Sequence, residues 1–126
     1  MKYTRFEELP VWQAAINLAI GIYQFTGDEK FRGQGSLRDQ IERATVSISN
    51  NVAEGFERGT TNELLSFLYI ARGSAGEVRS MLCLIERLPA FNNFKFEIFC
   101  RKYLPAVTSL GRCAAKFRNQ GPALFN

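Results

Sequence analysis

A helical repeat is clearest in residues 36–58, which read SLRDQIERATVSISNNVAEGFER. Apolar and small residues recur there at steps of three and four: Leu37, Ile41, Ala44, Ile48, Val52 and Gly55. A polar series follows at similar steps: Gln40, Arg43, Ser47, Asn51, Glu54 and Arg58. At about 100° per residue the two series form adjacent stripes on one helix, although a surface helix needs only the apolar one. The stretch therefore predicts a core-facing helix with a polar seam or a site beside its apolar stripe.

The polar stripe has three interpretations. In the first, its side chains satisfy one another's hydrogen bonds in a partly buried network, with Glu54 pairing with Arg43, Arg58 or an arginine of the next helix. In the second, its guanidinium and amide groups line a groove that binds phosphate or carboxylate. The third is a small-molecule pocket at Arg43, Glu54 and Arg72, which no substrate signature supports. We favour the network, because ion pairs of this kind are often purely structural.

The whole chain has helical rather than strand-like periodicity. We expect four helices over residues 9–26, 36–58, 61–88 and 93–118, separated by short connections and by less ordered stretches at residues 27–36 and 119–126. The helix limits come from local signals, namely Pro10 in the first turn, Ser36 as an N-cap, Gly59 as a stop, Thr60 with Glu63 as a capping box, and Pro105 as a kink or break. The predicted fold is all-α, a single domain over residues 1–126 forming an antiparallel up-down-up-down four-helix bundle.

A glycine-bearing motif, Arg72-Gly73-Ser74-Ala75-Gly76-Glu77, lies inside the third expected helix. A glycine in a helix interior costs about 1 kcal/mol relative to alanine, so a compensating interaction is expected. One compensation is close helix approach across Gly73 and Gly76, and the other is contact of Arg72 and Glu77 with the polar stripe. Both predict the tightest crossing of the bundle at this motif.

The positive charge of the chain is concentrated near its C-terminus. Residues 1–97 hold 11 Lys and Arg against 12 Asp and Glu, whereas residues 98–126 hold five cations and no acid, and the chain carries a net charge of +4. The five cations are Arg101, Lys102, Arg112, Lys116 and Arg118. They are candidate nucleic-acid-binding residues. The alternative is a solvated helix face whose cations favour the negative C-terminal end of the helix.

Several chemistries are disfavoured by residue type. The chain contains no histidine, which excludes Glu-x-x-His di-iron sites, histidine acid–base catalysis and His-ligated zinc. Its three cysteines, Cys83, Cys100 and Cys113, lack CxxC spacing and are expected to be buried thiols in a reducing compartment. Residues 33–36, GQGS, match only part of a phosphate-binding loop. We therefore expect no metal, no cofactor and no enzymatic activity.

The hydrophobic residues, 46% of the chain, suffice for a core and do not form a membrane span. The longest apolar stretch, residues 14–25, is interrupted by Asn17 and Gln24 and is shorter than the roughly 20 residues that a bilayer requires. Residues 1–10 are polar and lack the pattern of a signal peptide. These features predict a cytoplasmic protein without a membrane partner.

The motifs resemble a known family. They read Gln40-x-x-Arg43-Ala44-x-x-Ser47-Ile48-x-x-Asn51-Val52-Ala53-Glu54-Gly55-x-x-Arg58, then Phe67-Leu68-x-Ile70-Ala71-Arg72-Gly73-Ser74-x-x-Glu77, preceded by Phe6-x-x-Leu9-x-Val11-Trp12-x-x-Ala15. Over residues 6–88 the chain is similar to the four-helix-bundle proteins encoded in intervening sequences of bacterial large-subunit (23S) ribosomal RNA genes. It departs from their pattern at Val52, where isoleucine is usual, and in an extended linker around residues 31–35.

The resemblance implies a ring-like homopentamer and a distant relation to accessory proteins of diversity-generating retroelements, which bind nucleic acid and a reverse transcriptase through a basic surface. It implies no catalytic residue. Our leading hypothesis is accordingly a non-enzymatic homo-oligomer that binds structured RNA or a ribonucleoprotein partner through a basic face. The alternative is a protein–protein assembly scaffold with no nucleic-acid role. In that case the polar stripe, with Arg72 and Glu77, is a packing network.

Overall fold

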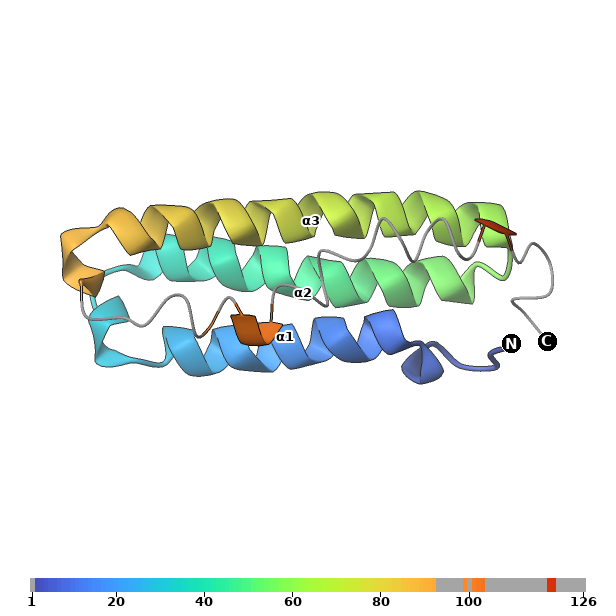
Figure 1. The fold of residues 1–126 in the computed structure, drawn as a ribbon, viewed down its shortest axis with the longest axis horizontal. Coiled ribbons are helices and arrows are strands. Elements are labelled where there is room, and N and C mark those ends of the chain that lie inside the picture. Colours follow the sequence, from blue (N-terminus) through green and yellow to red (C-terminus); the bar gives the residue numbers. More distant parts are fainter. Residues whose placement is uncertain (1, 93–98, 100, 104–117, 120–126) are drawn as a thin grey trace.

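The computed structural model of the chain describes residues 2–92, 99, 101–103 and 118–119 (Figure 1). Three long helices account for most of this part: α1 (Pro10–Thr26), α2 (Gly35–Glu57) and α3 (Thr61–Arg87). Short 3₁₀ helices flank them, η1 (Phe6–Glu8), η2 (Glu29–Phe31) and η3 (Pro89–Phe91). Within the described residues there is no β-strand element, which confirms the all-α class, and the predicted limits of the first three helices agree with the structure to within one residue.

Successive long helices run in opposite directions, and α2 packs against both α1 and α3 (Figure 1). The large side chains at their contacts are fully buried: Leu18, Ile22, Ile41, Ile48, Leu64, Leu68, Leu82 and Ile85. The predicted fourth helix, residues 93–118, falls largely outside the described residues, as does Pro105. Phe99, residues 101–103 and residues 118–119 are helical. None of the described helices is long and apolar enough to cross a membrane.

Local signals explain where the helices begin and end. The Thr60 hydroxyl accepts a hydrogen bond from the Glu63 N–H at 3.2 Å and donates to the Glu63 carboxylate at 2.9 Å, so the predicted cap of α3 is confirmed. Gly59, with a φ of +86°, provides the left-handed turn before it. The prediction for Ser36 was wrong. Helix α2 begins one residue earlier, and the Ser36 hydroxyl accepts from the Gln40 amide at 3.3 Å instead of capping.

The connection between α1 and α2 is more ordered than the sequence predicted. Asp28 caps η2 by accepting from the Lys30 N–H at 2.9 Å, and Phe31 is only 3% exposed. The Phe31 ring packs edge-on against Phe25 and against Phe91, each at a centroid distance of 4.8 Å. One aromatic side chain therefore anchors this connection to the end of α1 and to η3. Local glycine content does not reveal such an anchor.

Helices α2 and α3 approach each other closely at Gly55, and not at Gly73 or Gly76. A Cβ atom added to Gly55 would lie 2.6 Å from the Phe67 Cβ and 3.3 Å from the Leu64 Cα, so α2 and α3 meet at this glycine. Gly73 and Gly76 are exposed, with no other described side chain or helix within 4 Å of an added Cβ. The predicted crossing at residues 72–77 was therefore wrong. Gly55 lies on the apolar stripe of α2, whereas Gly73 and Gly76 lie on the outer face of α3.

The cysteine prediction also needs correction. Cys83 is exposed, because it lies 100° around α3 from the buried Leu82. Cys100 and Cys113 lie outside the described residues.

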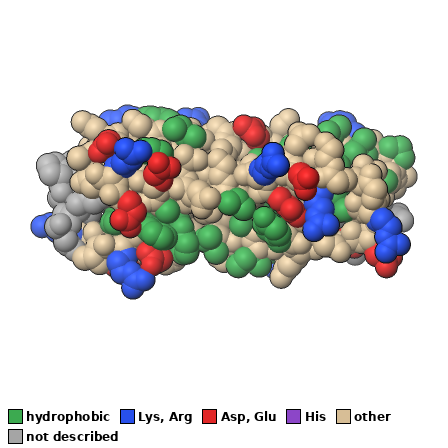
Figure 2. All heavy atoms as spheres, turned by 180° about the vertical axis from the view of Figure 1, so that it is seen from behind, with side chains coloured by type: hydrophobic (Ala, Val, Ile, Leu, Met, Phe, Trp, Pro, Cys, Tyr) green, Lys and Arg blue, Asp and Glu red, His purple; other side chains and the backbone are tan. Residues whose placement is uncertain are grey.

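Five large apolar side chains of the described part are about half exposed: Ile20, Tyr23, Tyr69, Ile70 and Leu84. Figure 2 shows hydrophobic side chains gathered along the lower part of one face, over α1, with charged side chains of both signs above them.

Candidate functional site

Three of the five candidate nucleic-acid-binding cations are described, and all three are exposed: Arg101, Lys102 and Arg118. Arg118 donates a hydrogen bond to the Tyr69 hydroxyl on α3, and its guanidinium carbon lies 6.0 Å from the centre of the Tyr69 ring. The Lys102 ammonium lies 5.2 Å from the centre of the Tyr103 ring. Arg112 and Lys116 lie outside the described residues. The described cations are therefore accessible to an anionic partner, and two of them lie beside tyrosine rings.

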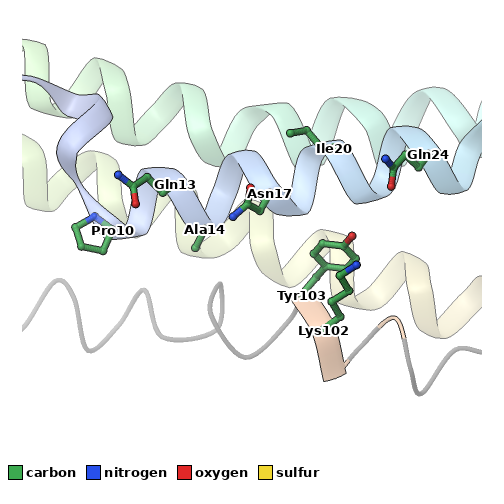
Figure 3. Close-up of a pocket in the computed structure, with 8 residues that line it drawn as sticks. All are labelled: Pro10, Gln13, Ala14, Asn17, Ile20, Gln24, Lys102 and Tyr103. Carbon is green, nitrogen blue, oxygen red and sulfur yellow. The ribbon is translucent and has the colours of Figure 1, made fainter.

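Lys102 and Tyr103 close one side of an open groove of about 590 Å³, called here the α1 groove (Figure 3). The other lining residues come from the outer face of α1: Pro10, Gln13, Ala14, Asn17, Ile20 and Gln24. These positions recur at three- and four-residue steps, so they share one face of the helix. In Figure 3 the side chains of Lys102 and Tyr103 extend from their segment toward α1. The described lining contains three amides, one cation and no carboxylate.

The amides differ in how they are bonded. The Gln13 amide donates to the Glu7 carbonyl at 3.0 Å, whereas Asn17 and Gln24 are exposed and make no hydrogen bond with described residues. Nearby, the Arg5 guanidinium donates a hydrogen bond to the Glu7 carboxylate and lowers the pKa of that carboxylate. Two amides of the α1 groove therefore retain donors and acceptors for a ligand.

Gly21 sets the position of Tyr103. A Cβ atom added to Gly21 would lie 2.5–3.0 Å from three ring atoms of Tyr103, so the ring occupies a notch that only glycine leaves on α1. The Tyr103 ring also packs against Phe99, with centroids 4.9 Å apart. Because Lys102 is the adjacent residue, this notch also fixes where the Lys102 backbone stands relative to the groove. The α1 groove was not predicted from the sequence, although Gly21 stands among large apolar residues of α1 and was a signal for a close contact.

The polar stripe of α2 lies at the surface, with only its centre packed against α3. Ser47 and Asn51 are half-buried, and the Ser47 hydroxyl lies 2.9 Å from the Ser74 hydroxyl of α3. The Asn51 amide donates to the Ser47 carbonyl at 2.7 Å and to its hydroxyl at 3.0 Å. A polar seam therefore joins α2 to α3 through small hydroxyl groups rather than through buried ion pairs.

The charged members of the stripe are exposed. Glu54 accepts from Arg58 at 3.2 Å within α2, and the side chains of this pair are 55% and 51% exposed. The Arg58 guanidinium carbon also lies 5.3 Å from the centre of the Phe67 ring on α3. Gln40 and Arg43 are exposed as well. Of the three partners considered for Glu54, the structure shows Arg58. The prediction of a partly buried network holds only at the centre of the stripe, where Ser47 and Asn51 lie.

Arg72 and Glu77 do not join the seam. Both are exposed and make no hydrogen bond or ion pair with the described residues of α2. Arg72 lies two positions, or about 200°, around α3 from Ser74, which explains why the serine reaches α2 and the arginine does not. A joint pocket of Arg43, Glu54 and Arg72 is therefore not formed by the described residues.

Arg43 instead lines a second open groove of about 540 Å³, called here the α2 groove. Its lining comes from α1 and α2: Tyr23, Asp39, Glu42, Arg43, Val46, Ser47, Asn50 and Asn51. The Glu42 side chain, 14% exposed, accepts from the Thr26 hydroxyl at 2.5 Å and from the Arg38 guanidinium at 3.2 Å. With two carboxylates against one guanidinium in its lining, this groove is less suited to an anion than the α1 groove.

The profile of one protein family, described as 23S rRNA-intervening sequence protein, matches residues 7–107. The chain belongs to this family. No curated protein and no solved structure matches it. The matched range of the 23S rRNA-intervening sequence protein covers α1, α2 and α3 and includes Lys102 and Tyr103, and it ends before Arg118. The described lining residues of the α1 groove therefore all fall inside the matched range, whereas part of the basic C-terminal quarter lies beyond it. No cluster of three or more metal-ligating side chains occurs among the described residues.

Proposed function

We propose that this 23S rRNA-intervening sequence protein is a non-enzymatic homo-oligomer that binds structured RNA, alone or in a ribonucleoprotein, through the basic surface of its C-terminal quarter. The observation that carries the proposal is the charge distribution, since the last 29 residues hold five cations and no acid. Exposure of Arg101, Lys102 and Arg118 supports it, because phosphate contacts supply most of the affinity of sequence-independent nucleic-acid binding.

The test is a titration of the protein into a fluorescent RNA hairpin, with duplex DNA as a comparison, at several salt concentrations. Neutralising Arg101, Lys102 and Arg118 to glutamine lowers the net charge from +4 to +1. We expect weaker RNA binding and a log–log salt dependence that is shallower by roughly 0.7–0.9 for each phosphate that the variant no longer neutralises.

The matched control neutralises three exposed cations elsewhere, Arg32, Arg79 and Arg87, and gives the same net charge. If binding depends on the position of the charge, the control keeps more affinity and a steeper salt dependence than the C-terminal variant. Equal losses in the two variants would reduce the effect to net charge and contradict a defined basic site. Wild-type protein that fails to bind RNA at low salt would contradict the proposed function itself.

A second candidate function, an assembly scaffold with no nucleic-acid role, is favoured by the exposed apolar side chains. Ile20 and Tyr23 on α1 and Ile70 and Leu84 on α3 are each about half exposed, and a partner that covered them would remove this apolar surface from water. Light scattering after size exclusion tests the homo-oligomer that both candidates share. A monomer at all accessible concentrations would exclude it.

The pair Glu54–Arg58 offers a sharper test of the scaffold. Because this i,i+4 pair is half exposed, Glu54→Ala should cost the fold only a few tenths of a kcal/mol. If the Glu54→Ala protein were fully folded but no longer assembled, the polar stripe would lie at a contact between subunits. A variant that remains both folded and assembled would exclude the stripe from that role.

A further inference from the structure

We propose that the α1 groove binds unpaired bases of an RNA strand, an inference that rests on the proposed function and specifies which part of the RNA is recognised. The first argument is chemical. Asn17 and Gln24 face the groove with amides that make no hydrogen bond to described residues. An amide presents a donor and an acceptor side by side, the combination that pairs with the edge of a nucleobase.

The second argument is the character of the remaining lining. Ile20 is 51% exposed in the groove and provides apolar surface for the face of a base. Lys102 extends from its helical segment toward α1 next to Tyr103, between Asn17 and Gln24 along the helix (Figure 3). Its ammonium is therefore placed for the phosphate of a nucleotide whose base contacts the amides. The groove volume, about 590 Å³, falls within the roughly 300–1,000 Å³ of small-ligand sites.

The third argument is the comparison with the α2 groove, which has a similar volume and also contains amides, Asn50 and Asn51. The lining of that groove includes the carboxylates of Asp39 and Glu42, whereas the described lining of the α1 groove has no acid. An anionic chain therefore favours the α1 groove, and the two grooves form an internal comparison within one protein.

The groove fits unpaired RNA better than a duplex. In an A-form RNA helix the base edges in the deep major groove are inaccessible to side chains, so sequence-specific recognition acts mostly on single-stranded loops and ends. The described lining of the groove, with three amides and a single cation, offers base contacts and little phosphate neutralisation. The basic surface of the C-terminal quarter then supplies affinity for the backbone, while the α1 groove supplies the preference for unpaired bases.

The experiment compares binding of the full chain to a hairpin with a single-stranded overhang and to a blunt RNA duplex of equal length. The variant is Asn17→Ala with Gln24→Ala, which leaves the net charge unchanged. Both side chains are exposed on a helix and alanine is the best helix former, so we expect the variant to remain folded, as thermal unfolding will verify. The matched control is Gln40→Ala with Asn50→Ala, two exposed amides of α2.

We expect each amide that the Asn17/Gln24 variant loses to weaken binding of the overhang hairpin by at least about fivefold, which is the effect of one net hydrogen bond. The salt dependence should not change, because the variant keeps the same charge. Blunt duplex binding and the control variant should be unaffected. If the variant bound the overhang hairpin as tightly as the wild type does, while substitution of the basic residues still lowered the salt dependence, the α1 groove assignment would be overturned. The proposed function would then stand. Equal wild-type affinity for overhang and duplex would also overturn the assignment. Wild-type protein that binds neither RNA would overturn the assignment and the proposed function together.

Discussion

Replacing Gly55 by alanine would place a methyl group at a close contact of α2 and α3. The added Cβ would lie 2.6 Å from the Phe67 Cβ and 3.3 Å from the Leu64 Cα, and neither atom can rotate away, because both belong to or adjoin the α3 backbone. The two helices must separate by about 1 Å, and overpacking of this kind costs typically 1–3 kcal/mol. Alanine regains about 1 kcal/mol of helix propensity, so we expect a net loss of about 0–2 kcal/mol in unfolding free energy.

Gly73→Ala is the matched control, because Gly73 occupies a helix interior with no other described side chain or helix within 4 Å of an added Cβ. It should gain about 1 kcal/mol from propensity alone. The two alanine variants should therefore differ by about 1–3 kcal/mol, or by about 4–12 °C in Tm for a domain of this size. The assay is thermal and urea unfolding at one fixed protein concentration, since assembly shifts apparent stability. If Gly55→Ala stabilised the protein as Gly73→Ala does, the close approach at Gly55 would be refuted.

Thr60→Ala should lower the unfolding free energy by about 1 kcal/mol, because the first turn of α3 loses its cap, as urea titration can measure. Thr26→Val should lower it by about 1–2 kcal/mol, because the Glu42 carboxylate loses its hydroxyl donor while the volume is conserved, and an unchanged midpoint would exclude this hydrogen bond as a stabilising contact. Cys83 should react with a maleimide in the native protein, identified by peptide mass mapping, and protection equal to that of a core thiol would contradict its exposure.

The helix limits were predictable because their signals are local. The repeat of Ile41, Ile48 and Val52 fixes a helix and its inner face, and the Gly59–Thr60 pair specifies both a stop and a start within two residues. Ser36 misled because a hydroxyl near a helix start can bond to a side chain one turn later, which competes with capping.

The candidate site was less predictable, because it depends on how elements are rotated and which distant residues meet. The polar seam was anticipated, but sequence spacing could not tell that Ser74, and not Arg72, faces α2. The α1 groove requires Tyr103 to rest on Gly21, a contact between residues far apart in the chain. One signal was available, since Gly55 lies on an apolar stripe and Gly73 does not, which separates a contact glycine from an exposed one.

The phenylalanine cluster makes the two ends of the bundle unequal. At one end Phe25, Phe31 and Phe91 join α1, the connection to α2 and the exit from α3, whereas at the other end α2 turns into α3 through the exposed Gly59 and Thr60. Backbone amides beside the cluster should therefore exchange with solvent only when the whole bundle opens, while those near Gly59 exchange by fraying. Because the cluster joins segments that are distant in the chain, truncating Phe91 would loosen the connection after α1 and the exit from α3 together, while both helices stay packed against α2.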